Sequence, residues 1–386
     1  MPSRRVASVD IVRGAVMVLM AIDHVRVYSG LPPGGPTRGI FFTRWITHFC
    51  APAFVFLAGT SASLYGDQLN DRPALSKFLL IRGLWLVFLE LTVLRLAWTF
   101  NLQFGTALAG VIWVLGWSMV VLAVLVRLPL TVVGILGAVI VAGHNLLSGI
   151  VAAIPDNGPS GPFAWLWQIL YLGGPIQFGS DGQVLFVLYV LVPWVGVMAL
   201  GYVFGAVLRW EPAAMRRACL TIGGAAIAFF LIFRGFNLYG DPRHWDGSHM
   251  PVALSFLNTT KYPASLLYLC MTLGPVIVLL PLLESAKGRI VDWLTTFGRV
   301  PLFYYLLHIP LIHLLALGYD AVRHRAAVPW MFENHPAMVG PAPDGSVWGL
   351  RELYLVFVIA MVLLTFACNW YASVKQTSTS RWLKYL

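Results

Sequence analysis

Long apolar runs recur along the chain, and short polar or Gly/Pro-rich connections separate them. A helix needs roughly 20 mostly apolar residues to cross the hydrocarbon core of a bilayer. The pattern therefore predicts an all-α fold, a polytopic transmembrane helical bundle of about ten spans. The predicted spans cover residues 8–29, 45–66, 75–97, 106–127, 130–152, 184–208, 214–236, 264–283, 297–319 and 352–373.

The composition agrees with this pattern and excludes a soluble protein. Hydrophobic residues make up 59% of the 386 residues, whereas charged residues make up only 11%. A formal net charge of +10 could suit nucleic acid. In a polytopic membrane protein, however, an excess of Lys and Arg gathers on the cytoplasmic side. We therefore expect membrane lipid and no nucleic acid as a partner, and one transmembrane domain over residues 1–386.

The positions of Lys and Arg predict the orientation of the bundle. The connections 98–105 and 153–183 contain no Lys or Arg. With a cytoplasmic N-terminus these connections lie outside, which satisfies the positive-inside rule and places both termini in the cytoplasm. The cations then expected inside are Arg4, Arg5, Arg72, Lys77, Arg127, Arg209, Arg216, Arg217, Lys287, Arg289, Lys375, Arg381 and Lys384.

The first span contains charge at a depth where lipid disfavours it. Its ionisable residues are Asp10, Arg13, Asp23, His24 and Arg26. Such residues usually face a protein interior or a water-filled cavity and serve a function there. Arg13 and His24 are eleven residues apart, so on a helix they share a face and lie roughly 16 Å apart along the axis. Asp10 with Arg13, and Asp23 with Arg26, have the spacing of ion pairs on one helix face.

The second and ninth spans carry the other deep polar groups. Pro52 lacks the N–H that would bond the carbonyl of His48, so a kink is expected beside that imidazole. In the ninth span Tyr304 and His308 are four residues apart and can touch, and His313 follows about a turn and a half later. We expect the first, second, eighth and ninth spans to surround a polar cavity.

Two kinds of chemistry suit these residues. An imidazole can remove a proton from a hydroxyl or amine near neutral pH, which makes His24 a candidate general base. Asp23 is adjacent in sequence but points about 100° away on a helix, so it need not touch that ring. His48 is the rival base. The guanidinium of Arg13 near the cytoplasmic face could meet the phosphates of an anionic ligand.

Several motifs carry a resemblance to a known family. They read SVDIVRG, LMAIDHVR, FVFLAGTSASLYG, NTTKYPASLLYLCMTLGP and FGRVPLFYYLLHIPLIHLLA. Together they resemble the bacterial relatives of the lysosomal heparan-α-glucosaminide N-acetyltransferase. Arg13 and His24 also reproduce the Arg, ten residues, His pattern on the first helix of the acyltransferase family 3 membrane enzymes. The family's catalytic histidine lies between its first two helices, where this chain has no His from Val25 to Thr47, so that residue is not carried over.

The resemblance implies a transmembrane acyltransferase of the bacterial inner (cytoplasmic) membrane. Its donor would be cytoplasmic acetyl-CoA or another acyl-CoA, without a metal, and its acceptor an extracytoplasmic sugar or amino sugar; a homodimer is left open. The candidate catalytic residues are His24, Asp23 and His48. The candidate donor-binding residues are Arg13, Asp10, Arg299, Tyr304 and His308. The candidate acceptor-binding residues are Arg26, Asn258, Lys261, Tyr262 and His313.

Two other classes of function stay open. Buried Arg, Asp and His residues also mark the substrate pathways of secondary transporters of polar or anionic solutes. Histidines on several helices could instead ligate b-type haem, whose iron binds imidazole. Haem gives Arg13 and Lys261 no role, whereas a visible spectrum of the purified protein would reveal it at once.

Overall fold

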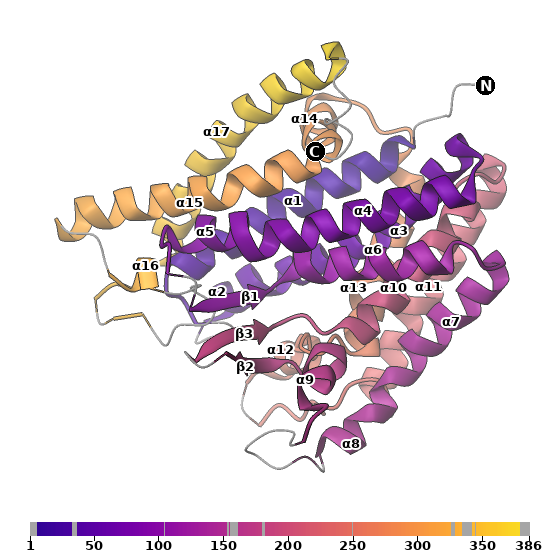
Figure 1. The fold of residues 1–386 in the computed structure, drawn as a ribbon, viewed down its shortest axis with the longest axis horizontal. Helices are drawn as coiled ribbons and strands as arrows, with labels where there is room; N and C mark the ends of the chain where they lie inside the picture. The colour runs from indigo at the N-terminus through magenta and orange to yellow at the C-terminus, as the bar shows by residue number, and fades with distance from the viewer. Residues whose placement is uncertain are drawn as a thin grey trace. The chain divides into compact units, whose positions relative to one another are not determined.

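We describe a computed structural model of the chain over residues 6–32, 37–103, 105–152, 154, 161–179, 182–248, 250–325, 329–333, 342–343 and 345–378. Within these residues the fold is predominantly helical and forms two compact units (Figure 1). The first unit comprises residues 1–6, 51–90 and 108–284, and the second comprises residues 7–50, 91–107 and 285–386. The predicted single domain is not tested by this division and stays a prediction.

The apolar runs form long helices, as the hydrophobic pattern predicted. Six helical stretches within the described residues are long and apolar enough to cross a membrane: Arg38–Leu69, Leu130–Ile150, Pro212–Gly235, Leu266–Leu283, Pro301–His324 and Leu350–Thr377. Two shorter apolar helices cover Val111–Leu125 and Leu191–Val207. The chain is thus a multi-pass helical membrane protein. The count of ten spans stays a prediction, and both termini, with Arg4, Arg5, Arg381 and Lys384, lie outside the described residues.

The first unit is built from helix pairs. Its helices are α3 (Cys50–Leu69, less its first residue), α4 (Arg72–Leu89), α6 (Val111–Leu125), α7 (Leu130–Gly143), α8 (Ser148–Ala152), α9 (Ala164–Trp167), α10 (Leu191–Val207), α11 (Pro212–Gly235), α12 (Val252–Leu257) and α13 (Leu266–Leu283), with a 3₁₀ turn η3 (His144–Leu147) and a π-helical turn η4 (Gln168–Leu172). The main packed pairs are α4 with α6, α11 with α13, and α7 with α10.

Small residues let these helices approach closely. A Cβ on Gly83 would lie 2.5 Å from the carbonyl oxygen of Gly116, and one on Gly116 would lie 2.6 Å from that of Gly83. The α4–α6 contact therefore depends on glycine at both positions, as small-residue interfaces between membrane helices do. Gly59 of α3 likewise faces the backbone of α10, because a Cβ there would overlap the carbonyl oxygen of Met198.

Three short strands depart from the all-helical expectation. Strands β2 (Gly174–Phe178) and β3 (Gln183–Val187) pair antiparallel. The carbonyl of Ala109, the last residue of β1 (Thr106–Ala109), accepts from the backbone N–H groups of Leu188 and Tyr189. Strands β1 and β3 occupy the predicted starts of the spans 106–127 and 184–208. A short apolar run does not by itself distinguish a buried strand from a helix start, which explains this error.

The second unit contains the first helix together with the last ones. Its elements are α1 (Ala7–Tyr28), α2 (Arg38–Trp45), the 3₁₀ turn η1 (Ile46–Phe49), α5 (Arg95–Thr99), α14 (Arg289–Arg299), α15 (Pro301–His324), α16 (Trp330–Glu333) and α17 (Leu350–Thr377). In the sequence, the first unit gives way to the second after Glu90, the first residue of a π-helical turn, η2 (Glu90–Leu94). Helices α1, α14, α15 and α17 pack against one another, and Figure 1 shows α15 and α17 side by side.

Glycine also sets the closest contact of the second unit. A Cβ on Gly14 of α1 would overlap the carbonyl oxygen of Leu294 in α14, and a Cβ on Gly298 would overlap the carbonyl oxygen of Asp10. The two helices therefore meet backbone to backbone at the N-terminal turns of α1. This contact brings Arg13 to the C-terminal end of α14.

Two residues of the second and third spans, Pro52 and Glu90, have local structural effects. Pro52 lies in the first turn of α3, directly after the 3₁₀ turn η1 that contains His48, so the regular α-helix is interrupted beside that imidazole. The carboxylate of Glu90 accepts from the N–H groups of Ile112 and Trp113 at 3.0 and 3.2 Å. Glu90 thus caps the start of α6, where helix N–H groups lack partners within the helix.

Candidate active site

The N-terminal part of α1 carries the first pair of predicted site residues. The carboxylate of Asp10 accepts from Arg13 at 3.3 Å, as the three-residue spacing predicted. Arg13 also donates to the carbonyl oxygen of Gly298 at 3.1 Å. That carbonyl lies in the last turn of α14, where helix carbonyls lack partners within the helix. Arg299 follows directly and is exposed, so Arg13 and Arg299 lie at the same end of α14.

The second ion pair of α1 is also the predicted one. Arg26 donates to Asp23 at 2.9 Å and to the carbonyl oxygen of Leu31 at 3.1 Å. The carboxylate next to His24 in sequence is thus engaged by the cation three residues later. Another group must orient the imidazole of His24.

That group is an imidazole of α15. Nδ1 of His24 lies 2.6 Å from Nε2 of His308. The other ring nitrogen of His308, Nδ1, lies 3.1 Å and 2.8 Å from the carbonyl oxygens of Tyr304 and Tyr305. His308 is fully buried, whereas His24 is half-buried. The ring centroids of His24 and Trp98 are 4.9 Å apart. Sequence spacing placed His24 and His308 on polar faces of their helices but did not predict that they touch.

Tyr304 lies beside this imidazole pair. Its ring centroid is 5.2 Å from that of His308, which confirms the contact predicted from the four-residue spacing. Its hydroxyl donates to the carbonyl oxygen of Met17 at 3.0 Å. The phenol therefore joins α15 to α1.

The contacts between α1 and the segment 298–313 follow one order. The partners of Arg13, Met17, His24 and Tyr28 are respectively Gly298, Tyr304, His308 and His313. Residue numbers rise together on both sides, so α1 and α15 run in the same direction. Since α1 is an unbroken helix from Ala7 to Tyr28, Arg13 and His24 lie roughly 16 Å apart along its axis, as expected.

His313 occupies an aromatic slot at the far end of this row. Its ring stacks on those of Tyr28 and Phe100, with ring centroids 4.8 Å and 4.1 Å apart, respectively. Nδ1 lies 3.2 Å from the carbonyl oxygen of Ala97 and therefore carries the hydrogen. Nε2 is buried and has no hydrogen-bond partner among the described residues. A hydrogen-bond acceptor is thus held in apolar surroundings.

The rival base, His48, belongs to the same unit. It is buried in η1, which packs against α1. Two residues later, the thiol of Cys50 contacts the carbonyl oxygen of Val16 at 3.2 Å. Val16 precedes His24 by eight residues, or about two helical turns. The segment that carries His48 therefore meets α1 nearer to Arg13 than to Tyr28.

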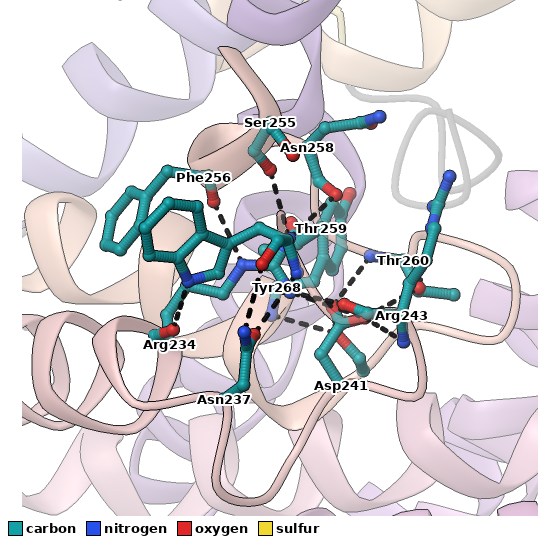
Figure 2. Close-up of polar contacts among 12 residues, drawn as sticks. Arg234, Asn237, Asp241, Arg243, Ser255, Phe256, Asn258, Thr259, Thr260 and Tyr268 are labelled. Atoms are coloured by element: carbon teal, nitrogen blue, oxygen red, sulfur yellow. Dashed lines mark hydrogen bonds and ion pairs between the residues drawn. The ribbon is translucent and has the colours of Figure 1, made fainter. Parts of the chain in front are cut away.

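The predicted acceptor contacts of the outer loop lie in the first unit, within one short segment. The ammonium of Lys261 lies 5.3 Å from the ring centroid of Tyr262. The hydroxyl of Tyr262 contacts that of Tyr189 at 3.4 Å. The backbone carbonyl of Asn258 accepts from Arg234 at 3.2 Å, which links the segment to a buried ion cluster (Figure 2).

Sequence reasoning missed this cluster, whose centre is Arg234. Its guanidinium donates to the carbonyl oxygens of Ser255 and Phe256 at 3.1 and 3.0 Å and lies 3.9 Å from the carboxylate of Asp241. Figure 2 shows the side chain surrounded by the loop that it holds. A basic residue in the last turn of an apolar helix, followed by an acidic loop residue, was the available signal.

Asp241 completes the cluster on the other side. Its carboxylate accepts from the N–H and the hydroxyl of Thr260, both at 2.8 Å, and from the hydroxyl of Ser265 at 2.8 Å. Ser265 also caps α13 by accepting from the N–H of Tyr268 at 3.1 Å. Arg234 therefore holds the segment 258–262 at Asn258, and Asp241 holds it at Thr260.

Metal and haem were tested against the side chains present. In the described part of the chain, no three His, Cys, Asp or Glu side chains converge as a group that could hold a metal ion. Two imidazole nitrogens that share an iron need a separation of about 4 Å, given metal–nitrogen bonds of about 2 Å. The 2.6 Å between His24 and His308 leaves no space for it. Metal independence stays a prediction.

The chain was compared with known protein families and proteins. The family model described as heparan-alpha-glucosaminide N-acetyltransferase, catalytic, matches residues 5–237, which is more than half of the chain. The matched part contains Asp10, Arg13, His24 and His48 and ends before His308. No curated protein matches the sequence.

Proposed function

Since the chain belongs to the heparan-alpha-glucosaminide N-acetyltransferase catalytic family, we propose that it is an acyl-CoA-dependent transmembrane acyltransferase. The acyl group, acetyl by the family's description, passes from a cytoplasmic acyl-CoA to a sugar or amino sugar on the other side of the membrane. The observation that carries the proposal is the contact of His24, which lies on the same helix as Arg13, with His308 of α15, because this contact orients the imidazole that would act as the base. The proposed setting is the inner membrane of a bacterium.

The proposed topology has ten spans with both termini in the cytoplasm. The distribution of Lys and Arg supports it through the positive-inside rule. Helix α1 is 22 residues long, or about 33 Å, which is enough to cross the hydrocarbon core despite its charges. Its ionisable side chains are compatible with a membrane because Asp10, Arg13, Asp23 and Arg26 are paired with each other or with backbone carbonyls, and His24 is paired with His308.

The donor would bind at the Arg13 end of α1. Arg299 is exposed beside the backbone contact of Arg13, so two guanidinium groups could meet the phosphates of CoA there. Asp10 orients Arg13 in this assignment. The pantetheine arm would then extend along the row of contacts between α1 and α15 and place the thioester near His24, roughly 16 Å away.

The reaction needs one base and no redox step. His24 takes the proton of the acceptor amine or hydroxyl while the acceptor nitrogen or oxygen attacks the thioester carbonyl carbon. A C–N or C–O bond forms, the C–S bond breaks, and the proton passes from His24 to the sulfur, which leaves as the thiol of CoA. A general base of this kind typically accounts for about 10²–10⁴-fold in rate.

The test uses the purified full-length protein in lipid nanodiscs with acetyl-CoA and a panel of amino sugars. CoA thiol release and the mass of the acetylated sugar are followed together. We expect His24→Ala to lower kcat by about 10²–10⁴-fold, whereas His324→Ala, an exposed control at the end of α15, keeps full activity. Transfer lost in His48→Ala and kept in His24→Ala would make His48 the base.

A transporter is the alternative outcome of the same experiment. Paired charges within a membrane helix, such as Asp23 and Arg26, also occur along solute pathways. Uptake of a polar solute into proteoliposomes, without thiol release for any acceptor in the panel, would replace the acyltransferase proposal by transport.

A further inference from the structure

The hydrogen on His308 can be placed from the chemistry of its neighbours. Its Nδ1 lies 3.1 Å and 2.8 Å from the carbonyl oxygens of Tyr304 and Tyr305. A carbonyl oxygen only accepts, so Nδ1 of His308 carries the N–H. A neutral imidazole has one N–H, and full burial of this ring opposes a charged form. Nε2 of His308 therefore carries a lone pair and can only accept a hydrogen bond.

The two imidazole rings meet edge to edge. Each ring nitrogen lies about 1.1 Å from its ring centroid, given C–N bonds of about 1.33 Å. The N···N distance of 2.6 Å thus allows the centroids to be no more than about 4.8 Å apart, and they are 4.8 Å apart with an interplanar angle of 20°. Both nitrogens must therefore lie nearly on the line between the centroids. The contact is a linear, in-plane hydrogen bond and not a stack.

This geometry determines which nitrogen of His24 is basic. A separation of 2.6 Å requires a hydrogen between the two nitrogens. Because Nε2 of His308 carries a lone pair and no hydrogen, the hydrogen belongs to Nδ1 of His24. We propose that His308 is a positioning residue that holds His24 as the Nδ1–H tautomer and so makes Nε2 of His24 the base. The inference rests on the proposed function and specifies the atom that acts in it.

The pair has an advantage over a carboxylate at membrane depth. A carboxylate partner would bring a negative charge into the span before any substrate binds, which is expensive there. Two neutral imidazoles carry no charge until Nε2 of His24 accepts the proton. The bond from Nδ1–H to His308 then becomes charge-assisted, and such hydrogen bonds are roughly twice as strong as neutral ones. The partner thus stabilises His24 most in the protonated state.

The first test reads the tautomers directly and needs no substrate. Protein labelled with ¹⁵N-histidine is measured by ¹⁵N–¹H NMR in nanodiscs, and the two signals are assigned with His24→Gln and His308→Gln. We expect both rings to be Nδ1–H tautomers. An Nε2–H tautomer of His24 in the unchanged protein would overturn the proposal.

The second test separates positioning from a structural role. His308→Phe removes the acceptor, and we expect kcat to fall about 10²-fold at unchanged KM for acetyl-CoA. His308→Gln keeps an amide oxygen that can accept from Nδ1 of His24, so it should recover part of kcat. Full kcat in a folded His308→Phe protein would refute positioning. If the tautomers are as expected but no acceptor is acylated, His308 still positions His24 and the proposed function fails.

Discussion

The hydroxyl of Tyr304 donates to the carbonyl oxygen of Met17 at 3.0 Å, one helical turn before His308 on α15. This bond fixes the register between α1 and α15 on which the contact between the two imidazoles depends. Its two partners are 287 residues apart in sequence.

Removing that hydroxyl should weaken the contact that fixes α15 against α1 without creating a cavity. Tyr304→Phe keeps the ring and leaves no unpaired donor, so we expect a loss of about 0.5–1.5 kcal/mol, the usual net value of one hydrogen bond. Thermal unfolding in nanodiscs measures it. The ¹⁵N signals of His24 and His308 should broaden or split in the same variant. An unchanged melting temperature and sharp signals would show that the register is set elsewhere.

The glycine contact between α1 and α14 should not tolerate a side chain. In Gly14→Ala the new Cβ would overlap the Leu294 carbonyl oxygen, so we expect a loss of about 1–3 kcal/mol, as for overpacked cores, or failure to fold. Gly318→Ala is the matched control, because nothing lies within 4 Å of its Cβ. Alanine in place of glycine within a helix raises the free energy of unfolding by about 0.5–1 kcal/mol, so the control should be as stable as the unchanged protein or more so. Equal melting temperatures for both variants would contradict the contact.

The two arginines at the donor end should behave differently. Arg299 is exposed, so Arg299→Ala should weaken acetyl-CoA binding with little change in stability. Arg13→Lys keeps the charge but loses the planar fork of donors, so it should weaken both donor binding and the contact with Gly298. Calorimetric titration with acetyl-CoA and thermal unfolding separate the two effects. Unchanged affinity in both variants would place the nucleotide elsewhere.

The buried cluster of the first unit should control acceptor affinity if segment 258–262 contacts the acceptor. Asp241→Asn removes the charge that faces Arg234, and breaking a buried ion pair costs about 3–5 kcal/mol. We expect a lower melting temperature and a higher KM for the acceptor at unchanged KM for acetyl-CoA. Asp246→Asn, an exposed aspartate of the same loop, is the control. An unchanged acceptor KM in a folded Asp241→Asn protein would remove the segment from the site.

Sequence spacing predicted contacts within a helix and missed those between helices. The pairs Asp10–Arg13 and Asp23–Arg26 and the contact of Tyr304 with His308 follow from the helical repeat alone, and all three are present. His24 and His308 are 284 residues apart, and no local pattern reports which helices become neighbours.

Two further contacts between helices could not be predicted from the sequence for the same reason. The carboxylate of Glu90 accepts hydrogen bonds from N–H groups of α6, and Gly59 faces α10. Charge and residue size were visible in the sequence, but both contacts depend on helix neighbours. The strand β3 was missed because its apolar residues 184–187 fit a helix start equally well.

The composition of the second unit has a consequence for biosynthesis. Helix α1 is made first, yet the helices that pack against it, α14, α15 and α17, begin only at Arg289, Pro301 and Leu350. Until the ribosome reaches them, Arg13 lacks the carbonyl of Gly298 and His24 lacks His308, and native contacts of such long sequence separation form slowly. We expect translation that stops before Arg289 to leave α1 poorly retained in the membrane and dependent on chaperones. Stable insertion of α1 would thus depend on helices made more than 280 residues later in the chain.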